Sequence, residues 1–307
     1  MEKVLKETSL KRLIVGRNEF CDFSSIQSAL DYWQDEQGPF ELTVLSGDYY
    51  ENILLYQSDI SIIGVGTVRI IGNRFALQKN EQQQEIGTFQ TATFFINGSN
   101  IAIENIDMIN NAGPGEKVGQ AVALYNEGTN VMFKSCSFKG YQDTICLGPL
   151  PPLQKNGQLF STPEIKTSLD EHSCHFSDCY IEGTVDFIFG GGAAVFQSCE
   201  IKSLRRPNNA EGFITAASTP EGKKGFHFEH CYLTGEEDVA NVFLGRPWRS
   251  FAKTTFANCR IVAHIHPTRW DDWDNHHNRK TVMFKEYKNI YYSKKELVML
   301  DWINFME

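Results

Sequence analysis

The sequence of 307 residues lacks any apolar run long enough to span a bilayer, and it is poor in basic residues. Its formal net charge is -9, from 29 Lys and Arg against 38 Asp and Glu. This shortage of positive charge argues against nucleic acid as a partner, because phosphate backbones are bound by basic patches. An acidic ligand would need a local group of Lys and Arg that opposes the overall field. We therefore expect neither nucleic acid nor a membrane as a partner.

Residues 1–8 lack the apolar stretch and the small-residue cleavage site of a signal peptide. On this basis we expect a cytoplasmic chain as written, or a secreted one if a leader has been removed. The eight cysteines include no Cys-x-x-Cys pair, and a structural zinc site usually needs such spacing. Packed thiols in a reducing compartment are therefore favoured over disulfides or a metal site.

A short phrase recurs along the chain: an aromatic residue, two polar residues, a cysteine, any residue and an apolar residue. Its copies are residues 133–138, 176–181, 196–201, 228–233 and 256–261. An earlier copy has Ile106 in the cysteine position. The cysteines of successive copies lie 43, 20, 32 and 28 residues apart. Uneven spacing of this kind is typical of a solenoid whose coils carry loops of different lengths. The cysteines should then form an interior ladder.

Strand and helix signals agree with a solenoid. Apolar residues around each phrase alternate at period two, which indicates strands, and turn glycines follow them closely. The one amphipathic segment, residues 23–33, places Ile26, Leu30 and Trp33 on one face, as a helix that caps the open end would require. We predict an all-β parallel β-helix with a short N-terminal capping helix, formed by residues 1–307 as one domain.

Two phrases, residues 140–145 and 183–190, each place one aspartate inside an apolar run that resembles a strand. A buried carboxylate is costly, so it needs a partner or a function. Asp143 and Asp186 each lie seven residues after the cysteine of a phrase, which predicts equivalent points on neighbouring coils, about 4.8 Å apart. At that distance one carboxyl group keeps its proton while the other ionises. Such a pair suits glycoside or ester hydrolysis; two turn aspartates that cap loop backbone are the alternative, disfavoured because both phrases resemble strands.

Two further phrases have two interpretations each. Arg246 and Trp248, in residues 244–248, could form a carboxylate clamp beside a ring that stacks on a sugar, or a buried ion pair with a core tryptophan. Gln120, in residues 119–124, could serve the same site or belong to an amide ladder along the coils.

Taken together, the phrases resemble the pectin methylesterase (pectinesterase) family, as a bacterial-type member. The resemblance covers nearly the whole chain, in family order, through residues 47–51, 63–73, 88–93, 110–114, 119–124, 140–145, 183–190 and 244–248. It implies a right-handed, single-stranded parallel β-helix that removes C6 methyl esters from pectin or methylated oligogalacturonides and releases methanol. No cofactor or metal is expected, and we expect a monomer.

The resemblance also implies roles for individual residues. Asp186 matches the nucleophile, and Asp143 the general acid that protonates methanol and then acts as base. Gln142 matches the oxyanion-hole donor, with Gln120 as an assisting amide. Arg246 matches the residue that keeps the nucleophile ionised.

Four further positions match the substrate cleft of the family: Thr88, Trp248, Trp270 and Trp273. The chain departs from the family pattern at residues 147–172, which resemble an insertion known in some bacterial members. We expect the insertion to leave the solenoid as a loop near the cleft, where it would shorten the groove and favour chain ends or oligomers.

Two other readings remain open at this point. One is another pectin-active β-helix enzyme, a lyase or a glycosidase, but a lyase would need a calcium site and a basic residue, and a glycosidase a different carboxylate set. The other is a non-catalytic carbohydrate-binding solenoid, which the presence of Asp143, Asp186, Gln142 and Arg246 argues against.

Overall fold

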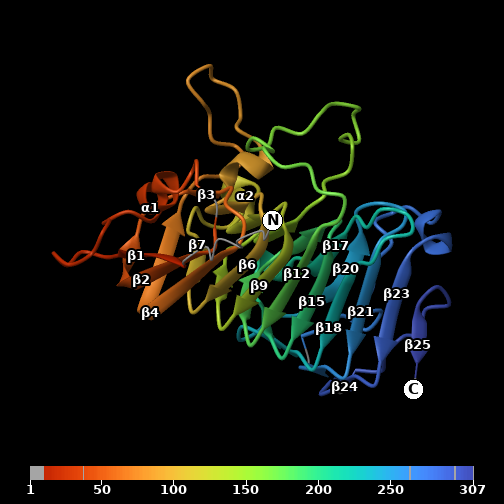
Figure 1. Ribbon diagram of the computed structural model, residues 1–307. Helices are drawn as coiled ribbons and strands as arrows, with labels where there is room; N and C mark the ends of the chain where they lie inside the picture. The colour runs from red at the N-terminus through yellow and green to blue at the C-terminus, as the bar shows by residue number, and fades with distance from the viewer. Residues whose placement is uncertain (1–9, 37, 263, 294, 307) are drawn as a thin grey trace, which may run out of the picture.

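The computed structural model describes residues 10–36, 38–262, 264–293 and 295–306. Its strands pair in parallel, coil upon coil, from β1 near one end of the molecule to β25 near the other (Figure 1). The predicted all-β parallel β-helix is therefore confirmed.

Three ladders of parallel strands form the walls of the coils. The first ladder consists of β1 (Lys11–Val15), β2 (Phe40–Tyr49), β4 (Ile60–Gly72), β6 (Ser99–Glu104), β9 (Thr129–Lys134), β12 (Ser173–Ser177), β15 (Ala193–Gln197), β18 (Phe226–Glu229), β21 (Lys253–Ala257), β23 (Met283–Tyr287) and β25 (Asn304–Met306). The second adds β7 (Asp107–Asn110), β10 (Ser137–Lys139), β13 (Tyr180–Gly183), β16 (Glu200–Ser203), β19 (Tyr232–Gly235), β22 (Arg260–Ile261) and β24 (Ile290–Tyr291). The third consists of β3 (Ile53–Leu55), β5 (Phe94–Ile96), β8 (Leu124–Asn126), β11 (Ile145–Leu147), β14 (Ile188–Gly190), β17 (Gly212–Ala217) and β20 (Val242–Pro247). The long strands β2 and β4 take part in both the first and the second ladder.

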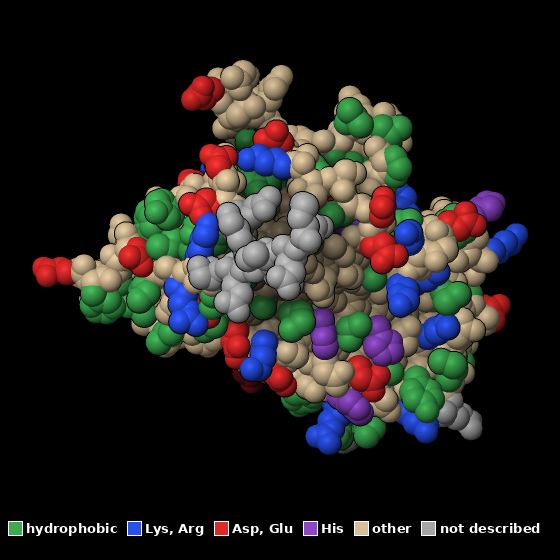
Figure 2. All heavy atoms as spheres, viewed as in Figure 1, with side chains coloured by type: hydrophobic (Ala, Val, Ile, Leu, Met, Phe, Trp, Pro, Cys, Tyr) green, Lys and Arg blue, Asp and Glu red, His purple; other side chains and the backbone are tan. Residues whose placement is uncertain are grey.

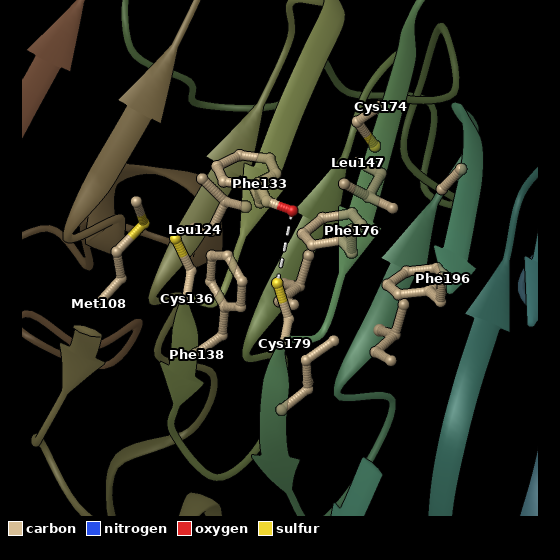
Figure 3. Packing of buried hydrophobic residues seen from close by; sticks show 14 of the residues in the cluster. Met108, Leu124, Phe133, Cys136, Phe138, Leu147, Cys174, Phe176, Cys179 and Phe196 are labelled. Atoms are coloured by element: carbon tan, nitrogen blue, oxygen red, sulfur yellow. Dashed lines mark hydrogen bonds between the residues drawn. The ribbon is translucent and has the colours of Figure 1, made fainter. Parts of the chain in front are cut away.

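The recurring phrase builds the centre of the core. Its aromatic residues stack in one column, with ring centroids 4.8 Å apart between Phe133 and Phe176 and 4.6 Å apart between Phe176 and Phe196 (Figure 3). The column continues through Phe228 and Phe256 at 4.3 and 4.4 Å. These spacings are close to the distance between neighbouring strands, so each ring rests on the equivalent ring of the next coil.

The cysteines of the phrase line up beside this column, as predicted. Each thiol donates to a backbone carbonyl of the preceding coil: Cys179 to Phe133 at 3.6 Å (Figure 3), and Cys231 to Phe196 at 3.2 Å. All eight cysteines are free. Ile106, in the cysteine position of the earlier copy, is also buried. The position therefore takes a small or branched apolar side chain, and a thiol adds a weak hydrogen bond there.

The predicted capping helix is α1 (Ile26–Tyr32), which is shorter at both ends than residues 23–33. Ser25 caps its first turn, and Glu51 accepts a hydrogen bond from the backbone N–H of Ile26 at 3.1 Å. A carboxylate is favourable at that end because helix N-termini carry partial positive charge. Leu30 and Trp33 are buried against the first coils, as the cap requires.

Two connections on one side of the coil bear on the site. Residues 73–93, with the 3₁₀ turn η1 (Thr88–Thr91), and residues 148–172 rise above the strands and leave a hollow between them (Figures 1 and 2). Short turns α2 (Gly115–Val118), η2 (Pro207–Asn209) and η3 (Asn278–Lys280) complete the helical elements of the described residues. Among these residues, no helix has the length and apolarity that crossing a membrane requires.

The aromatic column predicts where the fold is most sensitive. We expect Phe196→Ala to lower the free energy of unfolding by about 3–5 kcal/mol, because the ring is fully buried between two stacked neighbours. Chemical denaturation followed by circular dichroism would measure the change. Val195→Ala is the control on the same strand, since Val195 is 38% exposed and should cost less than about 0.5 kcal/mol. Equal losses in the two variants would contradict this account.

Candidate active site

The two aspartates lie in turns, which corrects the prediction that they sit within strands. Asp143 has φ 65° and Asp186 φ 49°, and both precede short strands, β11 and β14, that hold only the apolar ends of their phrases. Aspartate tolerates this left-handed conformation better than most residues. Each turn forms the corner between the second and the third ladder.

The turns stack on each other in register, as the equal offsets predicted. Ile145 pairs with Ile188, so the aspartates two residues earlier occupy the same point on successive coils. The backbone N–H of Asp143 donates to the Val185 carbonyl at 3.0 Å. Both carboxyl groups are thereby held at one corner, and both side chains are buried.

Arg246 binds one of the two carboxylates. Its Nε donates to Asp186 Oδ1 at 2.8 Å and its Nη2 to Asp186 Oδ2 at 2.7 Å, a two-pronged contact that favours the ionised form. The guanidinium lies 3.8 Å from the ring centroids of both Phe213 and Trp273, between them. This stack holds the guanidinium in the orientation of its contact with Asp186.

The register explains how Arg246 reaches back across one coil. Arg246 on β20 pairs with Ala216 on β17, and Ala216 pairs with Phe189 on β14. The small side chain of Ala216 leaves room for the arginine to extend over it towards Asp186. The clamp interpretation of Arg246 therefore describes its contact better than a buried ion pair in the core.

Electrostatics separates the two carboxyl groups. Burial raises the pKa of Asp143 well above its usual range, the negative charge of Asp186 raises it further, and Arg246 opposes the rise only in part. Burial also raises the pKa of Asp186, but the hydrogen bonds and the charge of Arg246 oppose that rise directly. Asp143 therefore keeps its proton to higher pH than Asp186 does, which provides a proton donor beside a carboxylate.

Two amide side chains lie beside the aspartates. Gln142 precedes Asp143 in its turn, and the backbone N–H of Ala121 donates to the Gln142 carbonyl at 3.1 Å, which places Gln120 on the adjacent coil. Both glutamines line the same cleft, so Gln120 belongs to the site and not to an amide ladder. A Cβ atom at Gly115 would come within 2.5 Å of Gln142 Oε1, so the glycine provides the space that this side chain occupies.

The cleft over these residues has a volume of about 610 Å³. It brings together eight of the residues singled out from the sequence: Thr88, Gln120, Gln142, Asp143, Asp186, Arg246, Trp248 and Trp273. In the described part of the chain, no group of three or more His, Cys, Asp or Glu is arranged to hold a metal ion.

Trp270 does not reach the cleft, and this corrects its expected place in the cleft wall. Trp270 pairs with Gly245, and Gly245 pairs with Thr215. All three occupy equivalent positions on successive coils of the third ladder, where side chains point into the interior. The ring of Trp270 is 2% exposed, stacks on Phe284 at 4.3 Å and donates to Glu286 at 2.9 Å. Trp273, three residues later, does line the cleft, as the sequence also predicted.

The insertion forms a wall of the cleft. The sequence predicted the loop near the cleft but did not show which of its residues line it. Gln154, Gln158, Phe160 and Ser161 all line the cavity, which confirms the loop's expected place near the cleft. Phe160 meets Phe89 edge-on at 5.2 Å and Trp248 at 6.0 Å. Phe160 is the one Phe, Tyr or Trp in residues 147–172, and this was the sequence signal for the contact.

Comparison with known families gives one match that covers most of the chain. A family model described as Pectinesterase matches residues 12–150 and 166–306. The segment between them, residues 151–165, is the middle of the insertion.

Curated plant proteins match over most of the chain. Pectinesterase 2 of Citrus sinensis is 28% identical over 297 residues, which are 94% of this chain and 52% of that protein. A pectinesterase/pectinesterase inhibitor of Arabidopsis thaliana is 30% identical over 304 residues, which are 95% of this chain and 58% of that protein. The chain thus spans about half the length of these curated relatives.

Solved structures share the fold. Pectin methylesterase PemA from Erwinia chrysanthemi has a TM-score of 0.77 at 22% identity, with 98% of this chain and 94% of that one covered. A pectin methylesterase in complex with a hexasaccharide has a TM-score of 0.77 at 23% identity, with 96% and 92% covered. These matches agree with the expected right-handed parallel β-helix, which is confirmed.

The raised pKa of Asp143 predicts that this carboxyl group costs stability at neutral pH. Because its pKa is higher in the folded than in the unfolded state, its favourable contribution is present at low pH and is lost as the pH rises through the folded pKa. We therefore expect Asp143→Asn to raise the free energy of unfolding by about 1–2 kcal/mol near pH 7 and to change it little near pH 3. Urea titrations at the two pH values would measure this.

The control is Asp178→Asn, at an exposed position that also has a left-handed backbone, φ 53°, on the solenoid. This variant should show no such pH-dependent gain. A loss of stability near pH 7 in Asp143→Asn would contradict the electrostatic account.

Proposed function

This chain belongs to the pectinesterase family, and from that premise we propose that it hydrolyses the C6 methyl esters of galacturonate in pectin or methylated oligogalacturonides and releases methanol. The observation that supports this best is that two stacked aspartates have different environments. Arg246 binds Asp186 with two hydrogen bonds, and Asp143, which receives none from it, is the group of higher pKa. A family structure in complex with a hexasaccharide supports the substrate class.

In the first step of the proposed reaction, the carboxylate of Asp186 attacks the carbonyl carbon of the ester. The carbonyl π electrons move to its oxygen, which becomes an oxyanion. In this mechanism, amide N–H groups of Gln142 and Gln120, which line the cleft from adjacent coils, donate to that oxygen. A donor of this kind contributes about 3 kcal/mol to transition-state stabilisation.

In the second step, the tetrahedral intermediate collapses and the bond to the methoxy group breaks. Asp143 donates its proton to the departing oxygen, so that methanol leaves and an anhydride joins Asp186 to the sugar carboxyl. Burial and the neighbouring carboxylate raise the pKa of Asp143, which keeps this proton in place until it is needed.

In the third step, water hydrolyses the anhydride. Asp143, now ionised, takes a proton from the water as its oxygen attacks the acyl carbon. The free galacturonate carboxyl group forms, Asp186 leaves as a carboxylate, and Asp143 is again protonated. The two aspartates thus return to their starting states.

The cleft supplies candidate sugar contacts beside the aspartates. Trp248 presents a ring between Phe160 and Phe189, which suits stacking on the face of a sugar. Thr88, at the start of η1, also lines the cavity. We propose that the chain works as one domain, because the ladders continue from β1 to β25, and that it acts as a monomer.

Replacement of the proposed nucleophile provides the main test. We expect Asp186→Asn to reduce methanol release from methylated pectin by about a thousandfold or more, because an amide cannot form the anhydride. Asp178→Asn, at an exposed turn away from the cleft, should retain wild-type activity. Methanol release by Asp186→Asn at the wild-type rate would overturn the mechanism. Formation of reducing ends or unsaturated products by the wild-type protein, without methanol, would instead indicate a glycosidase or a lyase.

Removal of the arginine should change the pH dependence. Because Arg246 opposes the rise in the pKa of Asp186, Arg246→Gln should move the acid limb of the profile of kcat/KM to higher pH. We expect activity to fall about tenfold more near pH 5 than near pH 8. Arg246→Lys keeps the charge without the two-pronged contact and should give an intermediate shift. An equal loss at every pH would contradict a role in ionising Asp186.

A further inference from the structure

A second cavity of about 210 Å³ adjoins the cleft. Gln154, Trp248 and Trp273 line both cavities, so the two lie side by side. The remaining walls come from residues 153–155 of the insertion, residues 247–250 after β20, and Asn275 with Asn278.

This second cavity carries two cations and no acidic side chain. Lys155 and Arg249 both line it, and every other lining residue is uncharged. Among the described residues neither cation has a carboxylate within ion-pair distance, although the protein as a whole has a net charge of -9. Two unpaired cations in an otherwise acidic protein form a local positive field.

Both cations are held in place by neighbouring groups. The Nζ atom of Lys155 lies 4.8 Å from the ring centroid of Trp273. Arg249 donates to the backbone carbonyl of Trp248 at 3.0 Å and to that of Leu153 at 3.1 Å. Arg249 thereby ties the insertion to the end of β20, and the two cations face one cavity.

The main cleft has the opposite character. It contains Asp143, Asp186 and Glu85, and its cation, Arg246, is already bound to Asp186. A free carboxylate on the sugar chain therefore meets no unpaired cation in the main cleft and is favoured beside Lys155 and Arg249. A methyl ester, which is neutral, needs no cation in the cleft.

We propose that the Lys155–Arg249 cavity is a subsite for the free carboxylate of a galacturonate further along the same chain than the reacting ester. The subsite rests on the proposed function, since it selects substrates for that reaction. Lys155 falls in residues 151–165, which the family model does not match, so the insertion adds this contact to the family scaffold.

Binding of unesterified oligomer tests the subsite without turnover. Calorimetry with fully de-esterified hexagalacturonate should give a dissociation constant about fivefold higher for Lys155→Gln than for the wild-type protein at low salt. About 0.5 M salt should abolish the difference, because it screens partly exposed charges. Lys166→Gln is the matched control: Lys166 is an exposed lysine of the same loop, lies over Tyr56 at 4.0 Å and does not line the cavity.

Kinetics supplies the second measurement. Lys155→Gln should lower kcat/KM about fivefold for partly de-esterified hexamer and leave it unchanged for fully methylated hexamer. Equal binding of the acidic hexamer by wild type and Lys155→Gln, or an equal loss in Lys166→Gln, would overturn the subsite. Failure of the proposed function would appear differently, as absence of methanol release from every substrate by the wild-type protein.

Discussion

The parallel register between successive coils is the constraint on which the rest of this structure depends. Because each strand pairs in parallel with its equivalent one coil away, side chains at the same point of the repeat meet directly. The register stacks Phe176 on Phe196 at 4.6 Å, and it aligns each thiol with a carbonyl of the coil before it. The same register sets Asp143 beside Asp186 through the pairing of Ile145 with Ile188. Core and site are therefore two products of one pairing rule.

The site also depends on a contact between coils that are not direct neighbours. Arg246 belongs to a coil two pairings away from the Asp186 turn and extends over Ala216 to reach the carboxylate. Only Asp186 receives the two hydrogen bonds, and two equivalent carboxyl groups become unequal as a result. Left-handed turns make the arrangement possible, because they aim both aspartates at one corner while the strands that follow return to the core. The proposed chemistry thus depends on a coil corner, where the backbone is free to depart from strand geometry.

The insertion adds what the repeating coils cannot supply. It brings Phe160 against Phe89 and Trp248, and Lys155 over Trp273. Regular coils place equivalent residues at equal intervals, so a wall that differs from one end of the groove to the other needs a loop outside the repeat. The cleft, whose cation is already paired with Asp186, and the basic cavity beside it then provide two electrostatic environments.

Sequence alone determined the solenoid, the thiol ladder and the pairing of Asp143 with Asp186. Each of these depends only on how far a residue lies from the repeated phrase, because one copy of the phrase occurs in each coil. The sequence also identified Arg246, Gln142 and Gln120 through a resemblance to a family. Tertiary structure decided the backbone conformation at the site, the direction of individual side chains and the path of the insertion. The backbone torsion angles at Asp143 and Asp186 placed them in turns, although their apolar neighbours resembled strands. Because Trp270 pairs with Gly245, its ring points into the core, whereas Trp273 lines the cleft. Phe160 and Lys155 acquired their places through contacts with distant coils, and no local pattern encodes where a long loop will fold back.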